Sequence, residues 1–147
     1  MKNIFIILSS LLLFTACNRD TSLRKKVPGW YTLQKKLDND ISLSGQLTYY
    51  KNGQLTIRAN VNRDLVKDFN LNFETTAKGT WKVENGYLKE EITQFITTPQ
   101  ILGDQLLVQY KKEFDNNIGY KILKVDKQEL QVKNNKGVIY TFKRIEK

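Results

Sequence analysis

The sequence predicts an all-β domain, an antiparallel up-and-down meander of about eight strands closed as a small barrel. Apolar and polar residues alternate with period two through most of residues 28–147, and this period indicates half-buried strands. Turn sequences rich in Asn and Gly separate the alternating segments. A meander has two exposed edge strands unless it closes, and closure into a barrel of eight strands removes both edges.

The first clear hairpin turns at residues 51–53. A three-residue loop pairs Tyr49 with Leu55, and the apolar side chains of both strands then fall on one face. A two-residue loop would instead pair Tyr49 with the polar Thr56. We therefore predict a type I turn with a bulge, in which Gly53 takes the left-handed conformation.

The later hairpins are predicted in the same way. The apolar odd positions from 69 to 83 indicate a long strand, whose hairpin would pair Val61 with Phe69 across a loop at residues 62–68. The last three predicted turns lie at residues 85–86, 126–129 and 135–137. They would pair Val83 with Leu88, Val125 with Leu130, Val132 with Tyr140 and Leu130 with Phe142.

Residues 99–114 carry two competing patterns. Thr98-Pro99 can begin a helix, and Leu102, Leu106 and Tyr110 are spaced by four. The same stretch also alternates from residue 106, and Gly103 weakens a helix. Helix and strand both stay open here, and the expectation is a loop followed by a strand from about Gln105.

The N-terminus has the organisation of a secretory signal. A short positive segment precedes an apolar stretch of 11 residues at 4–14, within the usual range of about 7–15 and short of the roughly 20 that a spanning helix needs. The following Leu13-Phe14-Thr15-Ala16-Cys17 resembles the lipobox of bacterial lipoproteins. The resemblance implies that residues 1–16 are removed and that Cys17, the single cysteine, carries lipid.

The lipobox resemblance also implies a location. The protein would be lipid-anchored in the cell envelope, and Asn18 favours the outer membrane facing the periplasm, with the inner membrane and the cell surface left open. Residues 17–27 would form a tether, and residues 28–147 one domain. Residues 17–36 carry six basic side chains and one acidic. Each cation near an anionic leaflet would add about 1 kcal/mol of attraction, although a merely solvated tether explains them equally well.

Composition argues against catalysis. The chain has no His, so the commonest general base and the commonest metal ligand are missing. Neither a phosphate-binding glycine loop nor a metal-ligand spacing occurs. We therefore expect no catalytic residue, no metal and no cofactor, and the anchor argues against a nucleic-acid partner.

Residues 28 to 145 resemble the calycin group, which includes lipocalins and small bacterial lipocalin-like domains. Gly79-Thr80-Trp81 is a G-x-W sequence, and Pro28-Gly29-Trp30 with Lys143-Arg144 resembles the pair of sites that closes a lipocalin barrel. The resemblance implies that Trp30 packs against Arg144 at the base of the barrel. The alternative is that Trp30 is a core residue.

Two functions follow from this architecture. In the first, the barrel binds a small apolar ligand such as a fatty acid, with Tyr49, Ile57, Phe73 and Trp81 lining the interior. In the second, the same side chains fill the core, and the domain is an interaction module for an envelope protein or the cell wall, as an inhibitor or assembly factor. Alternation alone leaves both open, because filled and hollow barrels have the same pattern.

Overall fold

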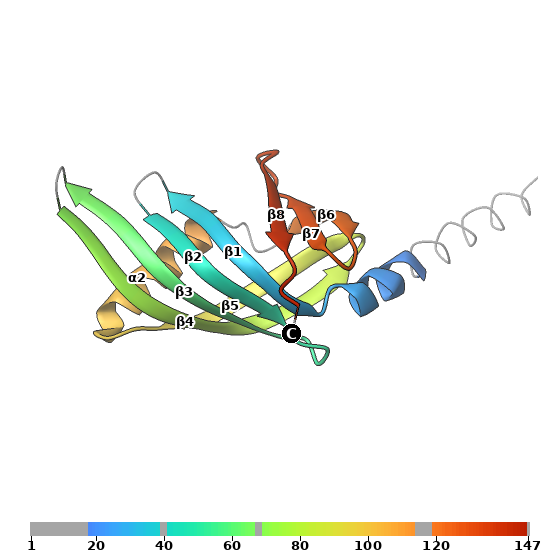
Figure 1. The fold of residues 1–147 in the computed structure, drawn as a ribbon, viewed down its shortest axis with the longest axis horizontal. Coiled ribbons are helices and arrows are strands. Elements are labelled where there is room, and N and C mark those ends of the chain that lie inside the picture. The colour runs from blue at the N-terminus through green and yellow to red at the C-terminus, as the bar shows by residue number, and fades with distance from the viewer. Residues whose placement is uncertain (1–17, 39–40, 67–68, 114–118, 147) are drawn as a thin grey trace, which may run out of the picture.

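A computed structural model describes residues 18–38, 41–66, 69–113 and 119–146. Its eight strands form one antiparallel sheet in chain order and curve into a nearly closed barrel (Figure 1), which confirms the predicted fold class. The strands are β1 (Gly29–Asp38), β2 (Ile41–Tyr49), β3 (Gln54–Val66), β4 (Phe69–Glu84), β5 (Tyr87–Ile96), β6 (Tyr120–Val125), β7 (Glu129–Lys133) and β8 (Ile139–Lys143).

Most of the predicted registers are confirmed. Tyr49 pairs with Leu55 across the residue 51–53 loop, where Gly53 has a φ of 84°. The residue 85–86 turn has two successive positive φ angles, as a tight hairpin turn requires. The pairs predicted for the other turns are also present: Val83 with Leu88, Val125 with Leu130, Val132 with Tyr140, and Leu130 with Phe142.

The predicted register of the hairpin between β3 and β4 is wrong. Val61 pairs with Phe73 rather than with Phe69, because β3 continues through the polar residues 62–64 and the chain turns only after Val66. The displacement is an even number of residues, so the side chains keep their predicted faces. β3 is therefore longer than the sequence suggested, whereas β4 begins at Phe69 as predicted.

The strand expected from Gln105 is also wrong, because the segment forms the helix α2 (Gln100–Glu113). Gly103 is the reason that a helix fits. A Cβ atom there would lie 2.2 Å from the carbonyl oxygen of Phe95, so only glycine lets the helix approach β5 this closely. Leu106 and Tyr110, one turn apart, are buried beneath the helix.

Helix α2 occupies a gap in the barrel wall. Strands β5 and β6 pair only through two residue pairs, Tyr87 with Lys121 and Leu88 with Tyr120. Beyond these pairs α2 lies against β5 and β1. On the other side of β6–β8 the barrel closes more tightly, because Ile145 donates a backbone hydrogen bond of 2.9 Å to the carbonyl oxygen of Trp30.

The chain before β1 is also helical within the described part, over residues 18–26. This helix covers most of the segment that we interpreted as a tether. It lies at the end of the barrel where the β2–β3, β4–β5 and β6–β7 turns gather (Figure 1). We call this the turn end. The cleavage expected after residue 16 and the lipid expected on Cys17 lie outside the described residues.

Candidate ligand-binding groove

A groove of about 350 Å³ opens at the end of the barrel opposite the turn end. Its walls are α2 on one side and, on the other, the start of β2, the far part of β3 and the start of β4 (Figure 1). The lining residues are Ile41, Val61, Arg63, Leu71, Phe73, Leu102, Asp104, Gln105, Leu106, Val108 and Gln109. The groove thus lies between α2 and three neighbouring strands of the sheet.

The side chains of this groove divide into an apolar lining and a few polar groups. Aliphatic and aromatic groups from three strands and α2 make up most of its surface. Arg63 and Asp104 supply charges, and the guanidinium of Arg63 donates a hydrogen bond of 3.4 Å to Gln105 Oε1. Apolar walls with a few polar groups are typical of sites for small ligands.

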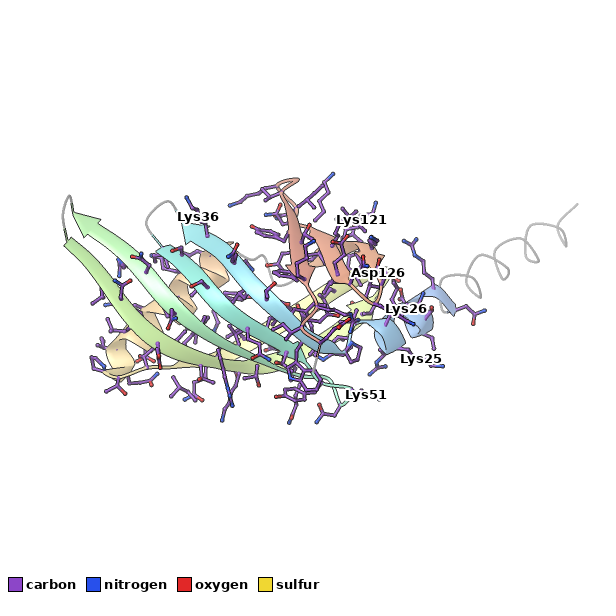
Figure 2. All side chains as sticks on the ribbon, in the orientation of Figure 1. Lys25, Lys26, Lys36, Lys51, Lys121 and Asp126 are labelled. Atoms are coloured by element: carbon purple, nitrogen blue, oxygen red, sulfur yellow. The ribbon has the colours of Figure 1, made fainter. Side chains whose placement is uncertain are left out.

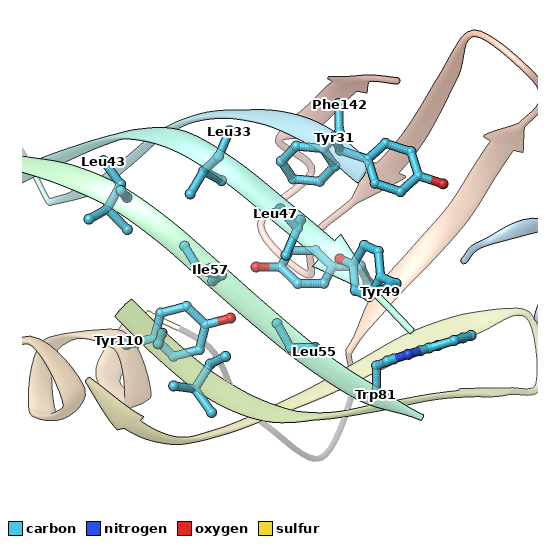
Figure 3. Packing of buried hydrophobic residues seen from close by; sticks show 14 of the residues in the cluster. Tyr31, Leu33, Leu43, Leu47, Tyr49, Leu55, Ile57, Trp81, Tyr110 and Phe142 are labelled. Atoms are coloured by element: carbon cyan, nitrogen blue, oxygen red, sulfur yellow. The ribbon is translucent and has the colours of Figure 1, made fainter. Parts of the chain in front are cut away.

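The four residues expected to line the interior have separate locations. Phe73 lines the groove. Tyr49, Ile57 and Trp81 are buried in the core (Figure 3). The ring of Tyr49 contacts Tyr31 and Trp81 edge to face, with centroid distances of 5.8 and 5.6 Å. These aromatic side chains pack together, so the turn half of the barrel has a filled core.

A buried polar cluster lies where the sheet divides between β5 and β6. Lys35 Nζ donates a hydrogen bond of 2.6 Å to the hydroxyl of Tyr120 and lies 5.0–5.3 Å from the ring centroids of Tyr110, Tyr120 and Tyr140. The hydroxyls of Tyr49 and Tyr110 both donate to the carboxylate of Glu90, the second at 2.9 Å. The cluster therefore joins β1, β2, β5, α2, β6 and β8 through side chains.

The protonation states of the cluster follow from its burial. Burial raises the pKa of Tyr49, Tyr110 and Tyr120 well above the usual value for a phenol, and the Glu90 carboxylate raises each further. A hydrogen bond with Tyr120 opposes this rise in the pKa of Tyr110. The three phenols therefore stay neutral. Tyr49 and Tyr110 donate to the Glu90 carboxylate, and Tyr120 accepts from the Lys35 ammonium.

Arg144 joins three segments at the turn end. Its guanidinium donates to the carbonyl oxygens of Asp126, at 2.8 Å, of Pro28, at 3.0 Å, and of Lys26. The guanidinium also lies 4.9 Å from the centroid of the Tyr31 ring. The lipocalin resemblance implied that Arg144 packs against Trp30. In the structure the Arg144 guanidinium contacts the ring of Tyr31, the residue after Trp30. The backbone carbonyl of Trp30 accepts the hydrogen bond from Ile145, the residue after Arg144.

A second, wider hollow of about 580 Å³ runs along β2, β3 and β4. Most of its lining side chains carry hydroxyl, amide or charged groups, among them Ser44, Arg58, Asn60 and Glu74. This surface is more polar than that of the groove beside α2, so we take the groove beside α2 as the candidate site.

The α2 side of the groove was missing from the sequence prediction because residues 99–114 were expected to form a loop and a strand. The spacing of Leu102 and Leu106 by four was the signal that could have identified it. Among the described residues, no three His, Cys, Asp or Glu side chains group as metal ligands do. Within the same part of the chain, no helix has both the length and the apolar character needed to cross a bilayer.

Comparison with known proteins assigns no family. A scan of the chain against models of protein families gives no match, and a search of curated protein sequences gives no significant match.

Proposed function

We propose that this chain is a lipoprotein of the cell envelope whose barrel binds a small apolar ligand in the groove between α2 and β2–β4. The lipid attached to Cys17 would hold the barrel at a membrane, most simply the outer membrane facing the periplasm. The ligand class is a fatty acid or another lipid fragment. The role is binding without catalysis, since the groove residues are mainly aliphatic and amide side chains.

The groove is the observation that carries the ligand proposal. Its volume of about 350 Å³ falls in the range of about 300–1,000 Å³ that small-ligand sites occupy. Leu102, Leu106 and Phe73 supply apolar surface from opposite walls. Each Å² of apolar ligand surface removed from water would contribute roughly 25 cal/mol.

Ligand binding is tested on the unlipidated Cys17→Ser protein. An apolar fluorescent probe should bind to it, and mass spectrometry of the purified protein should detect co-purified lipid. Absence of both the lipid and probe binding would overturn the ligand proposal.

Two matched variants locate the probe. Val108 and Ile101 are both exposed on α2, at 54% and 60%, but of these two only Val108 lines the groove. Val108→Glu puts a charge beside the apolar ligand and should weaken probe binding about tenfold, since an uncompensated charge near apolar groups is costly. Ile101→Glu should leave binding unchanged. Equal effects of both variants would exclude this groove as the site.

The lipid anchor has its own test. A Cys17→Ala variant expressed in bacteria should lose acyl label and leave the membrane fraction. Retention of the label in that variant would refute attachment at Cys17, whatever the result of the probe assay.

One observation favours the alternative, an interaction module for an envelope protein. Leu123 on β6, Ile139 on β8 and Val138 just before β8 are 44–55% exposed, and they add apolar surface outside the groove. Substituting all three with Ser should abolish binding of such a partner and leave probe binding unchanged. A module without a ligand would bind the partner and not the probe.

A further inference from the structure

The helix of residues 18–26 is fastened to the turn end of the barrel at its first turn. The Asp20 carboxylate accepts two backbone hydrogen bonds from the β4–β5 turn, one from Asn85 N at 2.6 Å and one from Gly86 N at 2.8 Å. Both turn residues have positive φ angles, 54° and 78°. Successive N–H groups in such a turn form a concave site for an anion, and here the anion is a side chain of the helix.

The other end of this helix is fastened as well. Leu23 packs against the hydrophobic core, and Val27 is fully buried. The Tyr31 hydroxyl donates a hydrogen bond of 2.5 Å to the carbonyl oxygen of Val27, and Arg144 donates to that of Lys26. With contacts at both ends, the helix has one orientation relative to the barrel.

The described chain begins at the turn end with Asn18, the residue that follows Cys17 in the sequence. The groove lies at the opposite end. Along β3, nine residues separate Gln54 near the turn end from Arg63 in the groove, which corresponds to about 30 Å of extended strand at roughly 3.3 Å per residue.

Exposed cations gather at the turn end. Arg24, Lys25 and Lys26 are exposed on the helix, and Lys51 is exposed on the β2–β3 turn (Figure 2). Lys127 is exposed on the β6–β7 turn.

Three acidic groups of this end are engaged by the protein itself. Asp20 binds the β4–β5 turn, and Glu84 pairs with Lys82 and Lys89. Asp126 pairs with Lys124 and accepts two backbone hydrogen bonds. These three carboxylates therefore interact within the protein, while the exposed cations of this end remain available to a partner.

We propose that the turn end lies on an anionic membrane surface, with Arg24, Lys25, Lys26 and Lys51 against the lipid headgroups and the groove directed away from the bilayer. This orientation rests on the proposed lipid at Cys17, because that anchor brings the turn end to the membrane. The Asp20 contact fixes the barrel relative to the helix and therefore relative to the membrane surface. The partner is a phospholipid surface of net negative charge.

The charge contribution is tested without the anchor. Cys17→Ser protein is sedimented at low salt with vesicles of phosphatidylcholine alone, or with vesicles in which about a third of the lipid is the anionic phosphatidylglycerol. It should bind the anionic vesicles only and dissociate as salt rises. Lys25→Gln with Lys26→Gln should weaken binding about 30-fold, at roughly fivefold per cation.

The matched control removes two cations elsewhere. Lys111→Gln with Lys112→Gln changes the same net charge on α2 and should leave vesicle binding within about twofold, because those cations lie away from the turn end. Equal losses in both double variants would overturn the proposed surface, and so would equal binding to neutral vesicles. These results do not depend on lipidation, so they separate this inference from the proposed anchor.

The orientation is tested on lipidated protein in vesicles that contain a spin-labelled headgroup lipid. Acylation of Cys17 leaves the chain without another cysteine, so Lys51→Cys and Lys36→Cys each accept one fluorophore. Both sites are exposed, the first at the turn end and the second far along β1 (Figure 2). The label at position 51 should be quenched strongly and that at 36 weakly. Equal quenching would overturn the orientation.

Asp20→Ala tests the cause of the orientation. Without the carboxylate, the helix loses its bonds to the β4–β5 turn and keeps only the contacts at its other end. The quenching difference between the two labels should therefore become smaller while the circular dichroism stays that of the parent protein. An unchanged difference would show that the contact does not orient the barrel. Mass spectrometry of Cys17 in the same preparation reports separately on the anchor.

Discussion

The ammonium of Lys35 donates a hydrogen bond of 2.6 Å to the hydroxyl of Tyr120 inside the barrel, and Lys35 is only 8% exposed. Two segments 85 residues apart in the chain meet at this bond. Lysine is rarely buried unless it is paired. Here the Tyr120 hydroxyl and three aromatic rings surround the ammonium, and one of these tyrosines, Tyr110, also donates to the Glu90 carboxylate.

Lys35→Met should lower the free energy of unfolding by about 3 kcal/mol, because it keeps the volume but leaves the Glu90 carboxylate without its cation. Urea denaturation measures this. Lys36→Met, at the adjacent exposed position of β1, should change stability by less than about 0.5 kcal/mol. Combining Lys35→Met with Glu90→Gln should cost at least about 1 kcal/mol less than the sum of the single changes. Additive losses would show that the two charges are not coupled.

Stability should fall steeply above pH 10. Burial raises the pKa of Tyr31 to about 12, against opposition from Arg144, and it also raises the pKa values of Tyr49, Tyr110 and Tyr120. The folded state therefore holds these protons after the unfolded chain has lost them. Each such tyrosine contributes stability that is complete below about pH 10 and declines by about 1.4 kcal/mol per pH unit above it.

Urea midpoints between pH 8 and 12, together with phenolate absorbance, measure this decline. Tyr31→Phe removes one of the titrating groups. The free energy of unfolding should then decline less steeply, by the contribution of one proton, about 1.4 kcal/mol per pH unit. A midpoint that stays constant up to pH 12 would contradict the assignment of these phenols as buried and neutral.

Arg144→Lys should destabilise the fold by about 2–4 kcal/mol. An ammonium cannot reach the carbonyl oxygens of Asp126, Pro28 and Lys26 in the way that the guanidinium does, and bonds from charged donors are worth about 1.5–3 kcal/mol each. Arg58→Lys is the matched control, because Arg58 is exposed on β3 and its change should cost less than about 0.5 kcal/mol. Similar denaturation midpoints for both variants would mean that Arg144 does not close the barrel.

Gly103→Ala should lower the stability of the protein, although the same substitution usually stabilises a helix. In an exposed helix Ala is more stable than Gly by about 1 kcal/mol. Here the added Cβ would lie 2.2 Å from the carbonyl oxygen of Phe95, so the variant should be less stable by about 2 kcal/mol. Val108→Ala, on the same helix and exposed, should be nearly neutral. A stabilised Gly103→Ala protein would show that α2 does not approach β5 this closely.

The sequence predicted those parts of the fold where local geometry decides. The Tyr49 to Leu55 register depends on one loop length and on the face of each apolar residue, and both are visible in the chain. The β3–β4 hairpin was misjudged because residues 62–64 are polar, and polar residues on an exposed strand face resemble a loop. Only pairing with β4 distinguishes the two.

The candidate site was harder to predict than the fold. By its intrinsic propensity Gly103 argues against a helix. It is needed there because the helix approaches the backbone of Phe95 closely, and no local pattern reveals that contact. Lys35 occupies an inward position of β1, after Tyr31 and Leu33, but a lysine in an alternating strand is normally counted as a break in the pattern. Both residues depend on long-range contacts, so the groove and the polar cluster had to come from the structure.

The two-pair junction between β5 and β6 has a consequence for how the groove accommodates its contents. Hydrogen-bonded strands in a sheet lie about 4.8 Å apart, and separating them breaks backbone hydrogen bonds. Along most of the junction the neighbour of β5 is α2, held by packed groups such as Phe95 and Tyr110, whose rings lie 5.9 Å apart. Side chains repack between rotamers at smaller cost than a ladder breaks. The barrel thus has one adjustable wall, and it is the wall that lines the groove.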